Sequence, residues 1–184
     1  MNIGKIKFDF YSQGSDLGSI RSEAVYGWDI GVLVQKKIGS SFKLRSEFNF
    51  IQKGGINEFT KYDLNELEMQ LNVNYEYNLN KFDLFIGLGG FVGYIINGEE
   101  TNLDWNIKIP MTLDGPARNR EDIGVVFYSG FSFQTNCGKL FLEGRYRQSI
   151  TNWHDYTSDS QFRQTFKNFD LGLNIGYLIK LRSK

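Results

Sequence analysis

Residues 67–77 read Leu-Glu-Met-Gln-Leu-Asn-Val-Asn-Tyr-Glu-Tyr, so six apolar or aromatic residues alternate with five polar ones. Successive side chains of a β-strand point to opposite faces, and a period of two therefore gives the strand one apolar face and one polar face. The stretch predicts a strand that separates an apolar environment from a polar one.

Seven further stretches alternate in the same way. The eight predicted strands cover about 3–11, 26–36, 42–50, 67–77, 82–94, 122–134, 140–147 and 169–179. Short turns follow the second, fourth and sixth strands, and longer connections follow the other strands. One of these contains Gly54-Gly55, the longest spans about 95–121 and holds both prolines, and a polar loop covers about 148–168. Lopsided loops of this kind are typical of outer-membrane barrels. We expect an all-β fold, an eight-stranded antiparallel up-and-down transmembrane β-barrel, as a single domain over 1–184.

The composition argues against a nucleic-acid-binding protein and against a membrane protein that spans the bilayer with helices. The chain carries 21 basic and 21 acidic residues, so no net charge attracts nucleic acid, and no run approaches the ~20 apolar residues of a spanning helix. A single cysteine, Cys137, excludes an internal disulfide. The N-terminus alternates like a strand and has no apolar signal core, so we expect the export signal of a bacterial outer-membrane protein to have been removed.

Alternation alone does not say which face points outward, because a soluble lipocalin-like ligand-binding barrel has the same period. The aromatic residues of the apolar face favour the membrane, since they form two belts like those at bilayer interfaces. The expected long-loop belt is Phe10, Trp28, Phe48, Phe50, Tyr94, Tyr146 and Phe169, and the expected short-turn belt is Phe42, Tyr75, Tyr77, Phe82, Phe133 and Tyr177. An eight-stranded barrel has no room inside for so many rings. We therefore expect the apolar face to contact the bilayer.

The opposite face of the strands then lines the lumen and brings charges into it. The expected lumen residues are Lys5, Lys7, Asp9, Asp29, Lys43, Arg45, Glu47, Glu68, Glu76, Asp83, Glu143, Arg145, Arg147 and Asp170. An unpaired buried charge is costly, so these groups are expected to pair with one another. The prediction is a plugged, non-conducting interior.

Four segments carry a resemblance to a known family. They are residues 26–32 (Tyr-Gly-Trp-Asp-Ile-Gly-Val), 42–54 (Phe-Lys-Leu-Arg-Ser-Glu-Phe-Asn-Phe-Ile-Gln-Lys-Gly), 84–94 (Leu-Phe-Ile-Gly-Leu-Gly-Gly-Phe-Val-Gly-Tyr) and 140–146 (Leu-Phe-Leu-Glu-Gly-Arg-Tyr). Together they resemble the PorT-like outer-membrane β-barrel family that is common in Bacteroidetes. The resemblance implies an outer-membrane barrel, and some members of that family take part in protein secretion across the envelope.

Catalytic groups are sparse. The single histidine, His154, has Ser158 and Ser160 nearby, which leaves an outer-membrane hydrolase as an alternative. One histidine and one distant cysteine do not make a standard transition-metal site, and no cofactor motif is expected to function. We therefore predict a protein that is not an enzyme and that serves as a structural or accessory interaction subunit of an envelope complex.

The long loops are the expected binding surface, because loops on a rigid scaffold often bind partners through exposed aromatic and apolar residues. Packing of these side chains on the barrel rim is the alternative explanation. The candidate partner-binding residues are Trp105, Ile107, Ile109, Trp153, His154 and Tyr156.

Overall fold

The computed structural model describes residues 2–3, 23–56, 59–113, 120–151, 154–158, 162–166 and 169–179. All regular structure in these ranges is β-strand, and none of it is a helix that could cross a membrane. The strands are β1 (Asn2–Ile3), β2 (Glu23–Ala24), β3 (Trp28–Lys37), β4 (Phe42–Ile56), β5 (Thr60–Leu79), β6 (Phe82–Asn102), β7 (Ile107–Pro110), β8 (Glu121–Gln134), β9 (Gly138–Ser149), β10 (His154–Ser158), β11 (Phe162–Phe166) and β12 (Phe169–Ile179).

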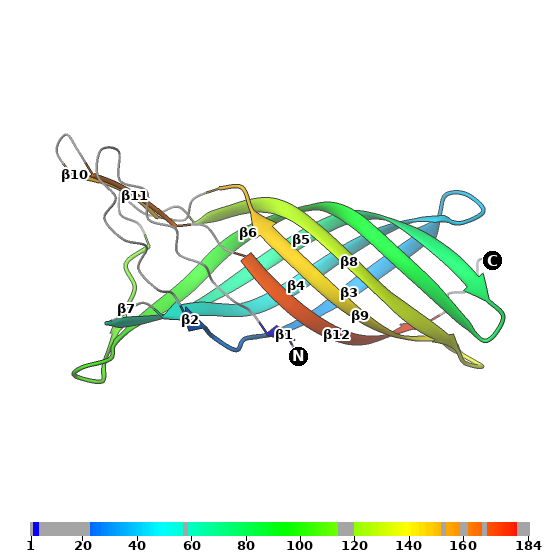
Figure 1. The fold of residues 1–184 in the computed structure, drawn as a ribbon, viewed down its shortest axis with the longest axis horizontal. Helices are drawn as coiled ribbons and strands as arrows, with labels where there is room; N and C mark the ends of the chain where they lie inside the picture. The colour runs from blue at the N-terminus through cyan, green and yellow to red at the C-terminus, as the bar shows by residue number, and fades with distance from the viewer. Residues whose placement is uncertain are drawn as a thin grey trace.

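The long strands form one antiparallel up-and-down sheet that curves around a lumen (Figure 1). The hydrogen-bonded order is β1-β12-β9-β8-β6-β5-β4, with β3 on the far side of β4. β1 pairs with β12 through Asn2↔Gly172 and Ile3↔Leu171 and lies close to β3, so the two ends of the sheet meet there. The predicted eight-stranded barrel is confirmed, although most of the predicted first strand, 3–11, lies outside the described residues.

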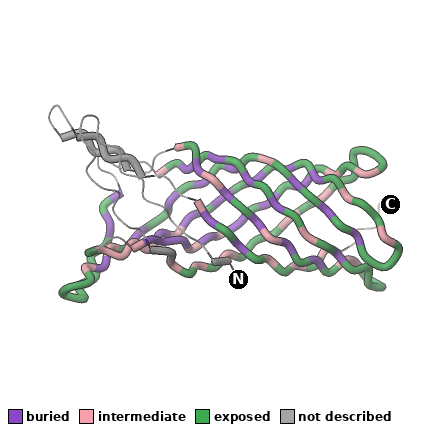
Figure 2. Tube along the Cα trace, viewed as in Figure 1, coloured by how far each residue is buried: buried purple, intermediate pink, exposed green. Residues whose placement is uncertain are grey.

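Burial alternates along the long strands of the barrel in the sense expected for a membrane barrel (Figure 2). On β5, Met69 is 60% exposed whereas the neighbouring Gln70 is 2% exposed. The outward residues are apolar and the inward residues are polar, which is the reverse of a soluble barrel. The soluble lipocalin-like alternative is therefore wrong.

Aromatic rings lie at both ends of the apolar surface. Near the long-loop end, the ring centroids of Trp28 and Phe50 are 5.3 Å apart. Near the turns, those of Phe42 and Tyr75 are 5.4 Å apart. These cross-strand pairs confirm two aromatic levels, as expected where a barrel meets the two bilayer interfaces.

Two predicted strand boundaries were wrong on the hairpin between β4 and β5. β4 continues to Ile56, so Gly54 and Gly55 pair with Asp63 and Tyr62 instead of forming a loop. A Cβ atom at Gly54 would come within 2.3 Å of the Tyr62 carbonyl oxygen. Gly54 therefore lies where two backbones approach closely, which is one common reason for a glycine within a strand.

The predicted loop 95–121 was also largely wrong. β6 continues to Asn102, and a turn with Asn106 in the left-handed region (φ 51°) leads to β7, which pairs back onto β6. A bulge at Ile96 shifts the register between β5 and β6. The predicted loop 148–168 contains the separate β10–β11 hairpin.

The β6–β7 hairpin, packed against the start of β5, has a small apolar core of its own. Leu64 and Ile95 are fully buried there and pack with Met111 and Leu113. The segment after β7 is fixed by a hydrogen bond from the Met111 amide to the Gly98 carbonyl, with an N–O distance of 2.8 Å. This core makes the hairpin a folded projection at the long-loop end of the barrel.

Candidate functional site: the charged lumen and the hairpin tip

The lumen charges lie at every second position of neighbouring strands. Alternation sends one residue in two inward, so β4, β5 and β9 each contribute a row of polar side chains to the same space. The buried polar residues of these three rows include Arg45, Glu47, Asn49 and Lys53; Glu66, Glu68, Gln70, Asn72 and Asn74; and Glu143, Arg145 and Arg147.

The centre of the lumen holds two arginines and two glutamates. Arg45 donates to both oxygens of Glu143 at 2.7 and 3.2 Å, which is a bidentate pair, and its Nε lies 2.6 Å from Glu47. Arg145 bonds the same two glutamates, with Nη2 2.9 Å from Oε2 of Glu47. Each guanidinium therefore contacts both carboxylates, and each carboxylate contacts both guanidiniums. Such charge-assisted pairs fix the geometry of a buried site.

An aromatic side chain supports this cluster. The Tyr128 ring is buried, and the Cζ atoms of Arg45 and Arg145 lie 4.8 and 5.5 Å from its centroid. The Tyr128 hydroxyl donates to Asn74. Cation–π contacts of this kind gain strength when water is excluded.

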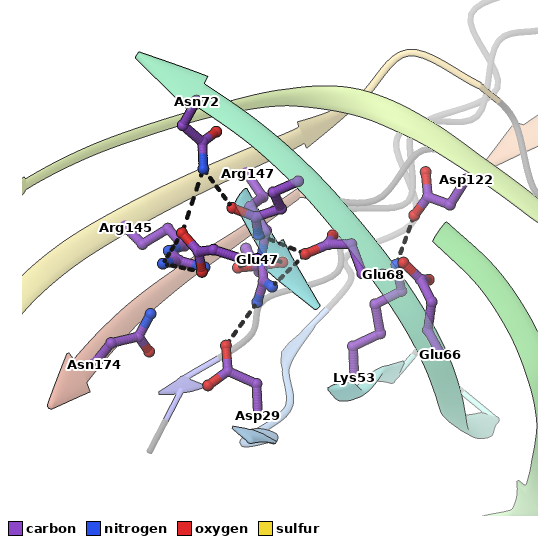
Figure 3. Close-up of polar contacts among 12 residues, drawn as sticks. Asp29, Glu47, Lys53, Glu66, Glu68, Asn72, Asp122, Arg145, Arg147 and Asn174 are labelled. Atoms are coloured by element: carbon purple, nitrogen blue, oxygen red, sulfur yellow. Dashed lines mark hydrogen bonds and ion pairs between the residues drawn. The ribbon is translucent and has the colours of Figure 1, made fainter. Parts of the chain in front are cut away.

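A second cluster is centred on Arg147, which lies nearer than Arg145 to the long-loop end of β9; Figure 3 shows Arg147 with Asp29 and Glu68. The Nε of Arg147 is 2.9 Å from both oxygens of Asp170, and its Nη1 is 3.2 Å from Glu68. Asp29 of β3 lies 3.7 Å from Nη2 of the same guanidinium. One arginine thus joins β3, β5, β9 and β12 across the lumen.

A third cluster lies still nearer the long-loop end than the second. The sequence prediction missed this cluster. Lys53 pairs with Glu66 and with Asp122, whose Oδ2 is 2.6 Å from the lysine Nζ (Figure 3). All three side chains are buried. Lys53 and Glu66 lie on the parts of β4 and β5 that were predicted to be loop, which is why they were not assigned to the lumen.

A fourth cluster lies near the turns. Lys139 pairs with Asp83 and with Glu76, which is 2.7 Å from its Nζ, and Lys43 pairs with Glu76 as well. Lys139 was also missed, because the sequence placed it in the turn at Cys137, whereas β9 begins at Gly138.

Within the described residues, the lumen therefore holds six cations and nine carboxylates in four clusters, and every one of those cations has at least one carboxylate partner. The cations are Lys43, Arg45, Lys53, Lys139, Arg145 and Arg147, and the carboxylates are Asp29, Glu47, Glu66, Glu68, Glu76, Asp83, Asp122, Glu143 and Asp170. The other three predicted lumen residues, Lys5, Lys7 and Asp9, lie outside the described residues.

Apolar side chains fill part of the space between the clusters. Phe85, Phe91, Val126, Tyr128 and Phe141 are buried together inside the barrel. A cavity of about 1130 Å³ remains in the half of the barrel near the turns, between β3 and β12.

The hairpin tip carries three of the predicted partner-binding residues. Trp105 is 76% exposed in the turn after β6, and Ile107 and Ile109 are 53% and 56% exposed on β7. The isoleucines thus belong to a short strand and not to an irregular loop.

The other three candidates lie elsewhere. Trp153 is outside the described residues, and His154 and Tyr156 are on β10. Ser158 is four residues from His154 on the same extended strand, which separates their Cα atoms by ~13 Å. Ser160 lies outside the described residues.

An antiparallel barrel with an apolar outer surface, two aromatic levels and a charged lumen defines the class of transmembrane β-barrel proteins. The sequence agrees: the family model for the outer membrane protein beta-barrel domain matches residues 1–155. The chain belongs to this family, and its place is the bacterial outer membrane, in contact with the lipid bilayer. No curated protein matches the sequence.

Proposed function

We propose that the protein is a non-conducting outer-membrane barrel that acts as an accessory interaction subunit of an envelope complex. The observation that carries the proposal is the β6–β7 hairpin, which projects beyond the long-loop aromatic level and exposes Trp105 at its tip. A folded projection with its own core presents a tryptophan at little cost in chain entropy, and tryptophan is enriched among residues that dominate binding energy.

The complex proposed is one of protein secretion or assembly. Support comes from the four segments that resemble the PorT-like family of Bacteroidetes, whose members include secretion components. The four segments fall on β3, β4, β6 and β9, although the first begins two residues before β3.

The test replaces the apolar tip. In the variant Trp105→Ser/Ile107→Ser/Ile109→Ser, envelope proteins that co-purify with the wild-type barrel after cross-linking in cells should be lost. Heat-modifiable gel mobility should be unchanged, because these exposed side chains do not stabilise the barrel. The matched control is Leu71→Ser, which changes an exposed apolar residue on the lipid face of β5. An identical set of co-purified proteins in the tip variant would contradict the proposal.

The non-conducting part of the proposal rests on the paired charges in the lumen. Ions crossing the barrel would have to separate the Arg45–Glu143 and Arg147–Asp170 pairs, and separating a buried pair is costly. Planar bilayers containing the purified protein should show no discrete conductance steps. Steps whose frequency scales with the amount of protein would contradict this part.

The proposal includes no enzymatic activity. Replacing His154 with Ala should leave the co-purified proteins unchanged, and lipase and protease assays should give equal rates for the wild type and the variant. A hydrolytic activity that is lost in His154→Ala would instead favour the hydrolase.

A further inference from the structure

The described lysines fall into two groups, according to whether a carboxylate neutralises them. The lysines that form ion pairs with carboxylates are Lys43, Lys53, Lys61, Lys108 and Lys139. The others, Lys36, Lys37 and Lys81, have no carboxylate partner among the residues that the structure describes. At the long-loop end, by contrast, each described lysine is paired.

The three unpaired lysines all lie at the turn end of the barrel, which is on the right in Figure 1. Lys36 and Lys37 are the last two residues of β3, and Lys81 lies in the turn between β5 and β6. All three are exposed. They are called the turn-end lysines below.

Carboxylates at this end do not offset the charge of the turn-end lysines. The carboxylates within residues 36–43, 76–83 and 134–139 are Glu76 and Asp83. Both are already paired with Lys139, and Glu76 is also paired with Lys43. The described part of the turn end therefore presents an excess of positive charge to its surroundings.

Lys36 places part of this charge on the lipid face itself. The outward residues that precede it on β3 are Trp28, Ile30, Val32 and Val34. Lys36 takes the next outward position, opposite the exposed Leu44 of β4. Phe42, in the turn-side aromatic level, begins β4 close by. A lysine in this setting can bury its aliphatic stem along the apolar surface and extend its ammonium group to the bilayer interface.

The position of these lysines selects a lipid as their partner. The short turns of bacterial barrels are periplasmic, so the turn end lies at the periplasmic leaflet. Lysines at a membrane surface attract anionic lipids and bind their headgroups. An acidic protein in the periplasm could reach exposed turns, but Lys36 follows a row of lipid-facing residues, where the nearest anions are lipid phosphates.

We propose that Lys36, Lys37 and Lys81 bind the headgroups of anionic phospholipids, such as phosphatidylglycerol, in the periplasmic leaflet. The acyl chains of the bound lipid lie against the apolar outward residues of β3 and β4. This lipid site is at the opposite end of the barrel from the hairpin tip, so it goes beyond the proposed function.

The test measures which lipid lies beside the turn-end lysines. The full chain with Cys137→Ser and Leu44→Cys is labelled with a fluorophore and refolded in phosphatidylcholine vesicles. A minor fraction of the lipid carries a nitroxide quencher in the acyl chain, either as phosphatidylglycerol or as phosphatidylcholine. The control label is at Leu67→Cys, an outward residue near the long-loop end of β5.

The quenching at position 44 should show that phosphatidylglycerol binds about fivefold or more tightly than phosphatidylcholine, and the preference should weaken at high salt. At position 67 the two lipids should quench equally. The preference at position 44 should be lost in Lys36→Gln/Lys37→Gln/Lys81→Gln and kept when the same lysines are changed to arginine. The matched control, Lys108→Gln, should also keep it, because Lys108 lies on β7 at the other end.

Equal quenching by the two lipids at position 44, or an unchanged preference in the glutamine variant, would overturn the proposal. Equal quenching together with loss of co-purified envelope proteins in the glutamine variant would overturn it in favour of an acidic polypeptide. Heat-modifiable mobility shows beforehand that each variant is folded, and the arginine variant separates loss of charge from loss of structure. The Trp105→Ser/Ile107→Ser/Ile109→Ser variant should keep the lipid preference, so this proposal and the proposed function fail separately.

Discussion

At the scale of single residues, stability depends on whether each buried charge keeps its partners. Glu143 is buried and accepts hydrogen bonds from Arg45, Arg145 and Asn174. Its loss would leave both guanidiniums with Glu47 as their one remaining carboxylate partner, since no other ion pair joins either of them within the described residues.

We therefore predict that Glu143→Gln lowers the free energy of unfolding by about 3–5 kcal/mol, the usual range when one member of a buried ion pair is removed. The measurement is urea unfolding in lipid vesicles, followed by tryptophan fluorescence. Glu99→Gln is the control, because the Glu99 side chain is 57% exposed and lies 3.9 Å from Lys108. A change of equal size in both variants would contradict the account of the central cluster.

At some inner-face positions of the barrel, a neighbouring side chain leaves no room for a Cβ atom, so only glycine fits. A Cβ atom at Gly87 would lie 2.3 Å from Cζ of the buried Tyr128, whereas at the outward Gly90 the nearest atom within 4 Å, a backbone oxygen, is at 3.5 Å. Gly87→Ala should lower the free energy of unfolding by about 1–3 kcal/mol through overpacking, and Gly90→Ala should change it by less. The same urea titration compares the two variants, and equal stability would show that Tyr128 moves aside without cost.

At the scale of elements, the β6–β7 hairpin, packed against the start of β5, has its own core at the long-loop end of the barrel. Leu64→Ala would leave a cavity among Ile95, Met111 and Leu113 and should destabilise the hairpin locally by about 2–5 kcal/mol. Limited proteolysis should then cut within 95–113 while heat-modifiable mobility is retained. Leu103→Ala, at an exposed position, is the control. Loss of the folded barrel band in Leu64→Ala would mean that the hairpin is needed for the barrel itself.

Several strands extend beyond the ends that were predicted from the sequence, because the alternating pattern is clear only in their central parts. Within the bilayer, the outward residues of a strand face lipid and the inward residues face the charged lumen, so apolar and polar residues alternate. The central parts of the strands were therefore predicted from this pattern alone. Beyond the aromatic level the outside is water, and the contrast is lost: Ile51 points inward and is 2% exposed, while the polar Gln52 takes the outward position. The strand ends, and with them Lys53 and Glu66, were missed for this reason.

At the scale of the whole molecule, lopsided loops and two aromatic belts were enough to predict the barrel and the direction of its faces. The pairing of individual charges was not predictable, because it depends on the register between strands. Arg45 and Glu143 lie on strands that are not neighbours and meet only across the lumen. The hairpin core was likewise hidden, since Met111 and Leu113 follow a proline and show no strand pattern.

The most direct test of the central claim, that the apolar face contacts lipid and the polar face lines a filled lumen, is cysteine scanning of residues 69–74 on β5. Each residue is replaced singly in a Cys137→Ser protein, labelled with a fluorophore and reconstituted in vesicles whose lipids carry a nitroxide quencher in the acyl chain. Strong quenching is predicted at Met69, Leu71 and Val73, which are exposed, and weak quenching at Gln70, Asn72 and Asn74, which are buried. The opposite phase, or no alternation at all, would contradict the account.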